Sequence, residues 1–306
     1  MESRKICTLK IVKDLFERNP RISYSSIHKM VRKEIGIRMR DTTRRYIEFG
    51  YNREILFPPR PVLRYHEDIH LHIQFVDGDL TDFENIINQK GSIRYACALA
   101  GSCECIMATS FRPVGDDLLF QRFTRANGYN VCERESFQHL LFFDENPVKL
   151  SLESKDLTWD RVDWELFDLL SPNFRAKYTD LSNVTGVEWR TVKARVEKRI
   201  IPACHTATYF FPRGQKSYQY VFLLFKTEYQ ENFMKKLDFM QTTTYFLLFG
   251  DSQVGVFMFP ENMNNLIKLF KKLEKDGIID DMRYFLPLAW EHIADLSWSG
   301  ARTWPT

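Results

Sequence analysis

Apolar residues recur at helical spacing in two separate parts of the chain. The predicted helices cover residues 5–19, 24–34 and 38–49 in the first part, and 160–170, 177–184 and 187–201 in the second. In both parts a glycine, Gly36 or Gly186, comes just before the third helix. Three helices with a tight turn before the third predict a helix-turn-helix. The last of these helices is expected to end before Pro202, because proline has no amide donor.

Strand patterns follow each helical part. In the second half, strands are predicted at 217–227, 243–249, 252–259 and 278–286, with helices at 229–239 and 262–276. In the first half, strands are predicted at 70–76, 93–99, 103–110 and 129–134, with helices at 81–89 and 116–127. Each set has the order βαββαβ of a ferredoxin-like unit. The predicted fold class is therefore α+β, with two copies of a winged-helix-like helix-turn-helix domain followed by a ferredoxin-like domain.

The two halves of the chain read as a degenerate internal repeat with an offset near 150 residues. Gly36 corresponds to Gly186, and Gly101-Ser102 corresponds to Gly250-Asp251. The predicted domains are a first helix-turn-helix (1–58), a first α/β domain (62–141), a linker (142–158), a second helix-turn-helix (159–203), a second α/β domain (206–296) and a tail (297–306).

Composition adds few constraints to this layout. The chain has 306 residues, and no apolar run approaches the ~20 residues that span a bilayer, so a cytoplasmic protein is expected. The six cysteines lack the paired spacing of a zinc site and are expected to be buried thiols. The alternative is a thiol sensor or soft-metal site at Cys97, Cys103 and Cys105. No metal or cofactor is predicted.

Charge is distributed unevenly along the chain. The net charge is +3, but residues 1–65 carry 16 Lys and Arg against 7 Asp and Glu. A positive N-terminal region on an otherwise slightly acidic protein suggests a site for a polyanion.

The second half resembles the Lrp/AsnC family of leucine-responsive, or feast/famine, transcriptional regulators. The residues that carry the resemblance are Asp160, Asp163, Leu169, Leu170, Arg175, Leu181, Gly186-Val187, Thr191-Val192 and Arg195-Val196, together with the Gly250-Asp251 turn. The resemblance implies a non-enzymatic regulator that binds double-stranded DNA, with an α/β domain for assembly and effector binding. It also implies a homodimer or higher oligomer formed through the α/β domains, or a pseudo-dimer within one chain.

Candidate site residues follow from the third helices and from the turns. The DNA-binding candidates are Arg38, Arg40, Arg44 and Arg45 in the first half, and Arg190, Thr191, Lys193 and Arg195 in the second. Arginine on such a helix can contact either guanine or phosphate. The candidates for binding an amino acid or another small effector are Gly101, Ser102, Gly250 and Asp251. The alternative for the basic helices is that their charged faces only contact solvent. The alternative for the turns is that they only connect the strands of a hairpin.

Two other functions stay open at this point. Siroheme decarboxylases share the paired layout of helix-turn-helix and α/β domains, and they use histidine and arginine against a tetrapyrrole. The histidines that prompt this alternative are His66, His70, His72, His139, His205 and His292. Against it, the basic third helices are present and the glycine-tyrosine strand motif of those enzymes is absent. A third alternative is a co-regulator that assembles with DNA-binding proteins but reads no DNA itself.

Overall fold

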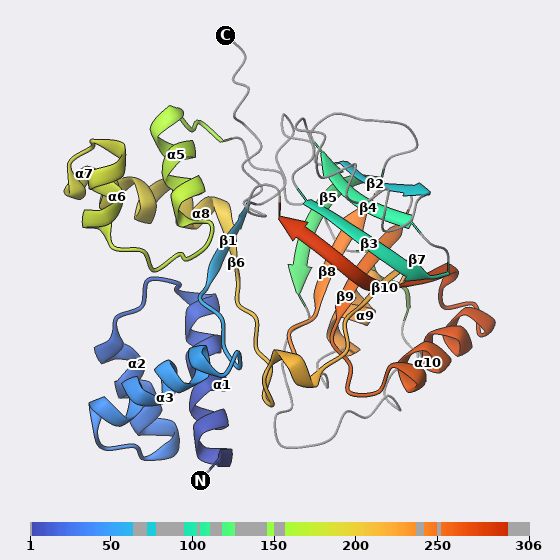
Figure 1. Ribbon diagram of the computed structural model, residues 1–306, viewed down its shortest axis with the longest axis horizontal. Coiled ribbons are helices and arrows are strands. Elements are labelled where there is room, and N and C mark those ends of the chain that lie inside the picture. The colour runs from blue at the N-terminus through green and yellow to red at the C-terminus, as the bar shows by residue number, and fades with distance from the viewer. Residues whose placement is uncertain are drawn as a thin grey trace.

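A mixed arrangement of helices and strands is seen in the computed structural model, which describes residues 2–63, 72–77, 95–102, 105–110, 118–125, 146–149, 157–236, 242–249 and 252–292. Two helical bundles lie on one side of the molecule and an antiparallel sheet on the other, with strands β1 and β6 running between them (Figure 1). The predicted α+β class is confirmed. Among the described helices, none has the length and apolar character that a membrane span requires.

The first bundle packs three helices around buried aliphatic and aromatic side chains. Its helices are α1 (Glu2–Arg18), α2 (Tyr24–Ile35) and α3 (Arg40–Asn52). The Ser23 side chain accepts a hydrogen bond from the Ser26 amide at the start of α2, and Gly36, with φ 69°, ends that helix. Leu9, Phe16 and Ile47 are almost fully buried in the bundle core. The three helices predicted in this part of the chain are confirmed.

The second bundle repeats this arrangement with a shorter middle helix. Its elements are α5 (Arg161–Leu170), α6 (Tyr178–Thr185), α7 (Trp189–Arg195), the π-helix η2 (Val196–Ile200) and α8 (Ile201–Ala203). The expectation that Pro202 ends the third helix is wrong. The helix widens into a π turn, in which the Ile201 amide donates to the Val196 carbonyl, and the chain stays helical through Pro202.

Arg195 and Arg199 fasten the third helix of the second bundle to the beginning of α5. Arg195 Nη1 lies 2.7 Å from Asp160 Oδ2 and 2.9 Å from Asp163 Oδ1. Arg199 Nη1 lies 2.7 Å from Asp163 Oδ2. Asp163 is fully buried, and it also accepts a hydrogen bond from the Asp160 amide in a capping box. The two arginines therefore neutralise a buried carboxylate and hold the bundle together.

A reciprocal pair of arginines joins the two bundles. Arg21 Nη1 donates to the carbonyls of Phe174 and Ala176, at 2.6 and 2.7 Å. Arg175 Nη1 donates to the carbonyls of Pro20 and Ile22, at 2.9 and 2.8 Å. The two arginines lie 154 residues apart in the chain, and the carbonyl groups that they bind are separated by the same number of residues. The contact therefore has approximate two-fold symmetry.

Cation–π contacts extend this symmetric joint. Arg21 lies 3.9 Å from the centroid of the Tyr178 ring, and Arg175 lies 5.3 Å from that of Tyr24. Beyond these tyrosines the offset between the halves falls to 150 residues at Gly36 and Gly186, because α2 has 12 residues and α6 has 8. The first bundle thus carries one additional helical turn.

Replacing Arg175 with alanine is expected to lower the free energy of unfolding by about 2 kcal/mol, because two carbonyls at the joint lose a charged donor. Urea denaturation followed by circular dichroism measures the change. The exposed Arg161, on the same bundle, is the matched control, and Arg161→Ala is expected to change the free energy by less than about 0.5 kcal/mol. Equal effects of the two substitutions would contradict a stabilising role for the joint.

Within the described residues, the sheet has eight antiparallel strands and closes on itself in the order β10-β3-β4-β2-β5-β8-β9-β7. The strands of the first half are β2 (His72–Asp77), β3 (Tyr95–Gly101), β4 (Cys105–Ser110) and β5 (Leu118–Arg125). Those of the second half are β7 (Val221–Lys226), β8 (Tyr245–Phe249), β9 (Gln253–Met258) and β10 (Asp280–His292). The halves meet twice, where β10 pairs with β3 and where β5 pairs with β8.

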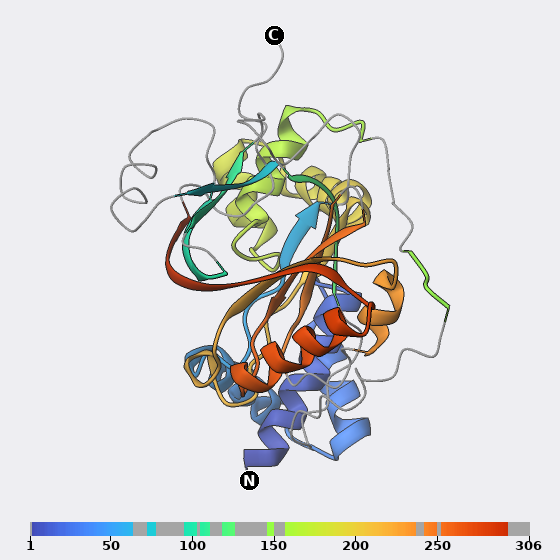
Figure 2. The same cartoon turned by 90° about the vertical axis from the view of Figure 1, so that its right-hand side faces the viewer.

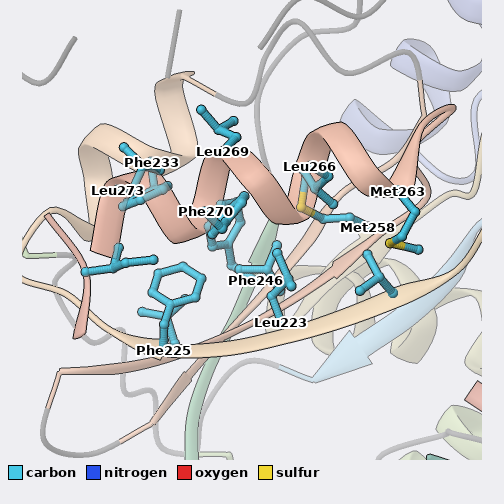
Figure 3. Packing of buried hydrophobic residues seen from close by; sticks show 14 of the residues in the cluster. Leu223, Phe225, Phe233, Phe246, Met258, Met263, Leu266, Leu269, Phe270 and Leu273 are labelled. Carbon is cyan, nitrogen blue, oxygen red and sulfur yellow. The ribbon is translucent and has the colours of Figure 1, made fainter. Parts of the chain in front are cut away.

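The second half has the predicted βαββαβ order, with α9 (Gln230–Lys236) and α10 (Met263–Lys275) between the strands. Both helices cover one face of the sheet, as the view from its side shows (Figure 2). Figure 3 shows how Leu266 and Phe270 of α10 point toward Leu223 and Phe246 of the strands. This spacing of apolar residues is what made the helix predictable.

The first half departs from the predicted order. Residues 116–127 were expected to form a helix, but residues Leu118–Arg125 form strand β5, which pairs with β8. Only residues 111–117 separate β4 from β5, too few for a counterpart of the 13-residue α10. The predicted helix at 81–89 and the predicted strand at 129–134 lie outside the described residues.

A separate two-stranded ribbon connects the bundles to the sheet. It pairs β1 (Arg60–Leu63) with β6 (Cys204–Ala207), and Arg60 lies opposite Ala207. The pairing continues beyond the strands, since the Phe57 amide donates to the Tyr209 carbonyl. We call residues 54–63 and 204–215 the connecting ribbon. It runs between the bundles and the sheet in Figure 1.

Candidate functional site: a basic pocket at the end of the connecting ribbon

A pocket of about 570 Å³ opens where the connecting ribbon meets the first bundle. Its lining comes from the beginning of α1, the end of α3 and the loop that contains the short 3-10 helix Gln215–Ser217. The lining residues are Lys5, Phe49, Arg53, Glu54, Ile55, Pro212, Arg213, Gly214, Gln215 and Lys216. Four of them are cationic and one is anionic, so the pocket attracts negatively charged ligands.

Unusual backbone conformations shape the rim of this pocket. Glu54 has a φ of 53°, which is rare for a residue with a side chain, and the Gln215 amide donates to its carbonyl at 3.0 Å. Gly214 has a φ of 85°, and a Cβ atom at that position would lie 2.9 Å from the Arg53 carbonyl oxygen. Only glycine allows the two chain segments to approach this closely. Such strain often accompanies ligand-binding sites.

The cations of the pocket are positioned by neighbouring side chains. Arg213 forms an ion pair with Glu261 and lies 5.4 Å from the centroid of the Tyr218 ring. Tyr218 and Glu261 raise the pKa of Arg213 above its ordinary value, so this group stays charged. Lys5 Nζ lies 4.2 Å from the centroid of the Phe49 ring. Arg213 is about half exposed and Lys216 almost fully exposed, so both can contact a ligand.

Aromatic rings continue from the pocket along the ribbon toward the sheet. Tyr209 and Phe211 stack with centroids 6.2 Å apart, and the ring of Phe57 packs edge-on against both. Tyr209 also contacts Tyr245 of β8, at 5.0 Å. The cations of the pocket therefore lie near an aromatic cluster, in which Phe57 and Tyr209 are half-buried and Phe211 is buried. This combination suits a flat ligand that carries acidic groups.

Most side chains predicted to contact DNA in the second half lie on the outer face of α7. Arg190, Thr191 and Lys193 are exposed there, while Arg195 is turned toward α5 by its ion pairs with the two aspartates. A shallow hollow of about 420 Å³ lies over this helix, lined by Arg190, Thr191, Ala194, Arg195, Lys198 and Arg199. Arg195 therefore has a structural role that its place in the sequence did not reveal.

In the first half, Arg38, Arg40, Arg44 and Arg45 are exposed, on α3 or just before it. Arg44 Nε forms an exposed ion pair with Glu48 Oε1 at 2.9 Å. A hollow of about 330 Å³ lies here, lined by Tyr24, Arg40, Asp41, Thr43, Arg44 and Glu48. Its two acidic residues offset its two arginines, so it lacks the net positive charge of the basic pocket.

The predicted effector turn of the first half lies where the two halves of the sheet join. The Ser102 amide donates to the Tyr284 carbonyl, and the Tyr284 amide donates to Ser102 Oγ, both at 2.9 Å. A Cβ atom on Gly101 would lie 2.4 Å from the same carbonyl oxygen. The structure thus gives Gly101 and Ser102 contacts that close the sheet. Gly250 and Asp251 lie outside the described residues.

The histidine and cysteine candidates are only partly described. His66, His70, His139 and Cys103 lie outside the described residues, and the side chains of His72, His292 and Cys105 are not described. Cys97 is buried inside the sheet, as expected for a structural thiol. His205 is half-buried on β6. Within the described part of the chain, no group of three metal-ligating residues comes together.

Sequence reasoning missed the basic pocket. Its lining comes from three segments that are far apart in the chain, and no motif marks any of them. The one available signal was the excess of positive charge in residues 1–65, which include Lys5 and Arg53.

Comparisons with known proteins concern the fold. No protein-family model matches the sequence, and no curated protein matches it. Among solved structures, the chain is similar to the crystal structure of the siroheme decarboxylase NirDL, with a TM-score of 0.50, 8% identity, and 96% of each chain covered. A crystal structure of NirDL in complex with an iron-uroporphyrin III analogue gives a TM-score of 0.49 and 9% identity, covering 98% of this chain and 96% of the other.

These findings overturn the prediction of an Lrp/AsnC transcriptional regulator, and with it the prediction that the chain is not an enzyme. No model of that family matches, and the solved structure that matches over almost the whole chain is of an enzyme. The physical reason for the error is that helix periodicity reports how three helices pack, whereas function depends on the groups at a site. Arg195 agrees with this correction, because this predicted DNA-binding side chain is engaged in ion pairs within the bundle.

Proposed function

We propose that this chain is an enzyme that acts on a tetrapyrrole carrying several carboxylates, and that it belongs to the decarboxylase type. The observation that carries the proposal is the similarity of fold to a siroheme decarboxylase over 96% of both chains. A similarity of fold alone leaves the chemistry open. The basic pocket and its aromatic surroundings supply the second, independent support.

We also propose that the chain is a tandem duplication of a helix-turn-helix domain followed by a ferredoxin-like domain, with the boundaries predicted from the sequence. The supports are the reciprocal contacts of Arg21 and Arg175 and the strand order, in which 3-4-2-5 of the first half mirrors 8-9-7-10 of the second. Between the described strands of the first half, seven residues connect β4 to β5, where the second half has α10 between β9 and β10. Assembly into larger oligomers stays a prediction.

The basic pocket fits the acidic groups of such a substrate. Siroheme and its relatives are flat macrocycles with acetate and propionate side chains around the rim. Arg53 and Arg213 can each grip a carboxylate through two parallel hydrogen bonds, and Lys5 adds a point charge. The half-buried rings of Phe57 and Tyr209 leave some apolar surface near these cations.

Decarboxylation places two requirements on the protein. The carbon–carbon bond to the carboxylate breaks, carbon dioxide leaves, and the electron pair that stays on the substrate carbon takes up a proton, so no net oxidation occurs. The protein must therefore hold the macrocycle in one orientation, and it must shield the departing carboxylate from water. The pocket cations would bind those carboxylates that stay on the product, which fixes the position of the ring.

Incubation of the purified chain with siroheme in the absence of oxygen tests the proposal. Loss of carbon dioxide from siroheme, followed by liquid chromatography and mass spectrometry, is the expected result. The double variant Arg53→Gln/Arg213→Gln is expected to weaken siroheme binding about 100-fold, since two charged contacts are lost. Fluorescence quenching or absorbance titration measures the affinity.

The matched control is Arg44→Gln/Arg190→Gln, which removes two exposed arginines of the third helices and should leave siroheme binding unchanged. If the native chain neither binds siroheme nor changes its mass, the proposed function is wrong. Equal weakening in both double variants would indicate attraction by overall charge and would place the site elsewhere.

A further inference from the structure

Arg60 occupies an unexpected position on the connecting ribbon. Residues 60 and 62 of β1 point to the same face of the ribbon, because side chains alternate along a strand. Val62 belongs to the apolar cluster inside the closed sheet, and so does Ala207, which lies directly opposite Arg60. Arg60 is therefore on the ribbon face that is turned toward the sheet interior. The surroundings there are aromatic, including Phe222, Tyr245 and Phe285.

The Arg60 guanidinium has one buried nitrogen that the described part of the chain does not satisfy. Its Nε atom is buried, and it finds no hydrogen-bond acceptor among the described residues. No carboxylate of those residues pairs with it, in contrast to Arg195 and Arg213. A buried N–H group without an acceptor is unfavourable, so such groups are normally hydrogen-bonded. The side chain as a whole is only half-buried, which leaves it accessible to a ligand.

Tyr209 adds a second polar group beside Arg60 on the same ribbon face. It follows Ala207 by two residues and packs against the cluster inside the sheet. Burial raises the pKa of the Tyr209 hydroxyl, and the nearby charge of Arg60 lowers it only in part. The hydroxyl therefore keeps its proton at neutral pH and can donate a hydrogen bond to an anion. Arg60 and Tyr209 together offer a cation and a donor, and the Tyr209 ring stacks on Phe211 and meets Tyr245 edge-on.

We propose that Arg60, assisted by Tyr209, binds one carboxylate of a flat, polycarboxylated ligand between the connecting ribbon and the sheet, away from the basic pocket. The inference rests on the proposed function and deepens it, because a tetrapyrrole polyacid carries carboxylates around its whole rim. Recognition of such a ligand requires cations at separate places. The bound carboxylate also supplies the opposite charge that the described residues do not offer to this guanidinium.

The test compares the native chain with Arg60→Met and Arg60→Lys, using metal-free uroporphyrin III as the probe. Methionine keeps most of the volume and removes the charge, whereas lysine keeps the charge. Arg60→Met is expected to weaken uroporphyrin binding at least tenfold, and Arg60→Lys less. Arg60→Met should not lower the melting temperature, because it removes a buried Nε–H group that has no acceptor among the described residues and keeps most of the side-chain volume. Coproporphyrin III, which has fewer carboxylates, should lose less affinity in Arg60→Met than uroporphyrin does.

The outcomes separate this inference from the proposed function. If the native chain binds uroporphyrin and Arg60→Met binds it equally well, the assignment of Arg60 is wrong and the proposed function stands. If the native chain binds no tetrapyrrole, the proposed function is wrong, and this inference is wrong as well because it rests on that function. A lower melting temperature in Arg60→Met, with weakened binding that Arg60→Lys does not partly restore, would assign Arg60 a structural role and overturn the proposal.

Discussion

Replacing Gly101 with alanine is expected to lower the free energy of unfolding by about 3 kcal/mol or more, one of the largest effects expected for a single substitution in this chain. The new Cβ atom would lie 2.4 Å from the Tyr284 carbonyl oxygen, which is backbone and cannot rotate away. The φ angle of Gly101, 140°, is also unfavourable for alanine. Both effects act where β3 pairs with β10, so the joint between the halves should open.

Urea denaturation followed by circular dichroism measures this loss. The matched control is Gly277→Ala, at a glycine with a φ of 70° where a new Cβ atom would have no neighbour within 4 Å among the described residues, so that only the backbone preference changes. Its expected cost is about 1 kcal/mol. If the two alanine variants were equally stable, close packing at the joint would not be what requires glycine at position 101.

Replacing Asp163 with alanine is expected to lower the free energy of unfolding by about 3–5 kcal/mol. This carboxylate is fully buried, and it pairs with Arg195 and Arg199 while accepting the amide hydrogen bond of Asp160. Its removal leaves two guanidinium groups with one half-exposed partner, Asp160. Chemical denaturation measures the effect.

Asp180→Ala is the control for this prediction, because Asp180 is an exposed aspartate in the first turn of α6, in the same bundle. A change below about 0.5 kcal/mol is expected there. A small effect at Asp163 as well would contradict the view that Arg195 stabilises the bundle through its ion pairs.

The pH dependence of stability provides a further check. Burial alone would raise the pKa of Asp160, but the hydrogen bonds from Arg195 and from backbone amides lower it overall. The stabilisation by Asp160 is therefore present above its unfolded pKa, near 4, and declines as the pH falls through the lower folded value.

The helices could be predicted from the sequence because their signals are local. Apolar spacing and capping residues, such as Ser23 before α2 and Asn262 before α10, lie within the segments that they define. Strand β5 could not be predicted this way. Its residues are held by pairing with β8, more than 100 positions away, and such tertiary contacts override local preference. The π turn before Pro202 was missed for a similar reason, since its geometry depends on packing of the whole bundle.

The candidate site was harder to predict than the fold. Its cations converge only because the connecting ribbon pairs residues 54–63 with residues 204–215. Nothing in the sequence near Arg53 or Arg213 indicates that these residues are neighbours. In contrast, the basic third helices are conspicuous in the sequence, and they drew the functional interpretation toward DNA. A run of charge along a helix is visible in one segment, whereas a pocket made by three segments is not.

The closed sheet has a consequence for how this protein can evolve. Each half supplies both edges that the other half needs, β3 and β5 on one side and β10 and β8 on the other, within a single polypeptide. In an assembly of two identical subunits every substitution appears twice, and a harmful copy accompanies each useful one. Here each position occurs once in the closed sheet. One half can thus change while the other preserves the scaffold, and the two bundles already differ, since α2 has 12 residues and α6 has 8.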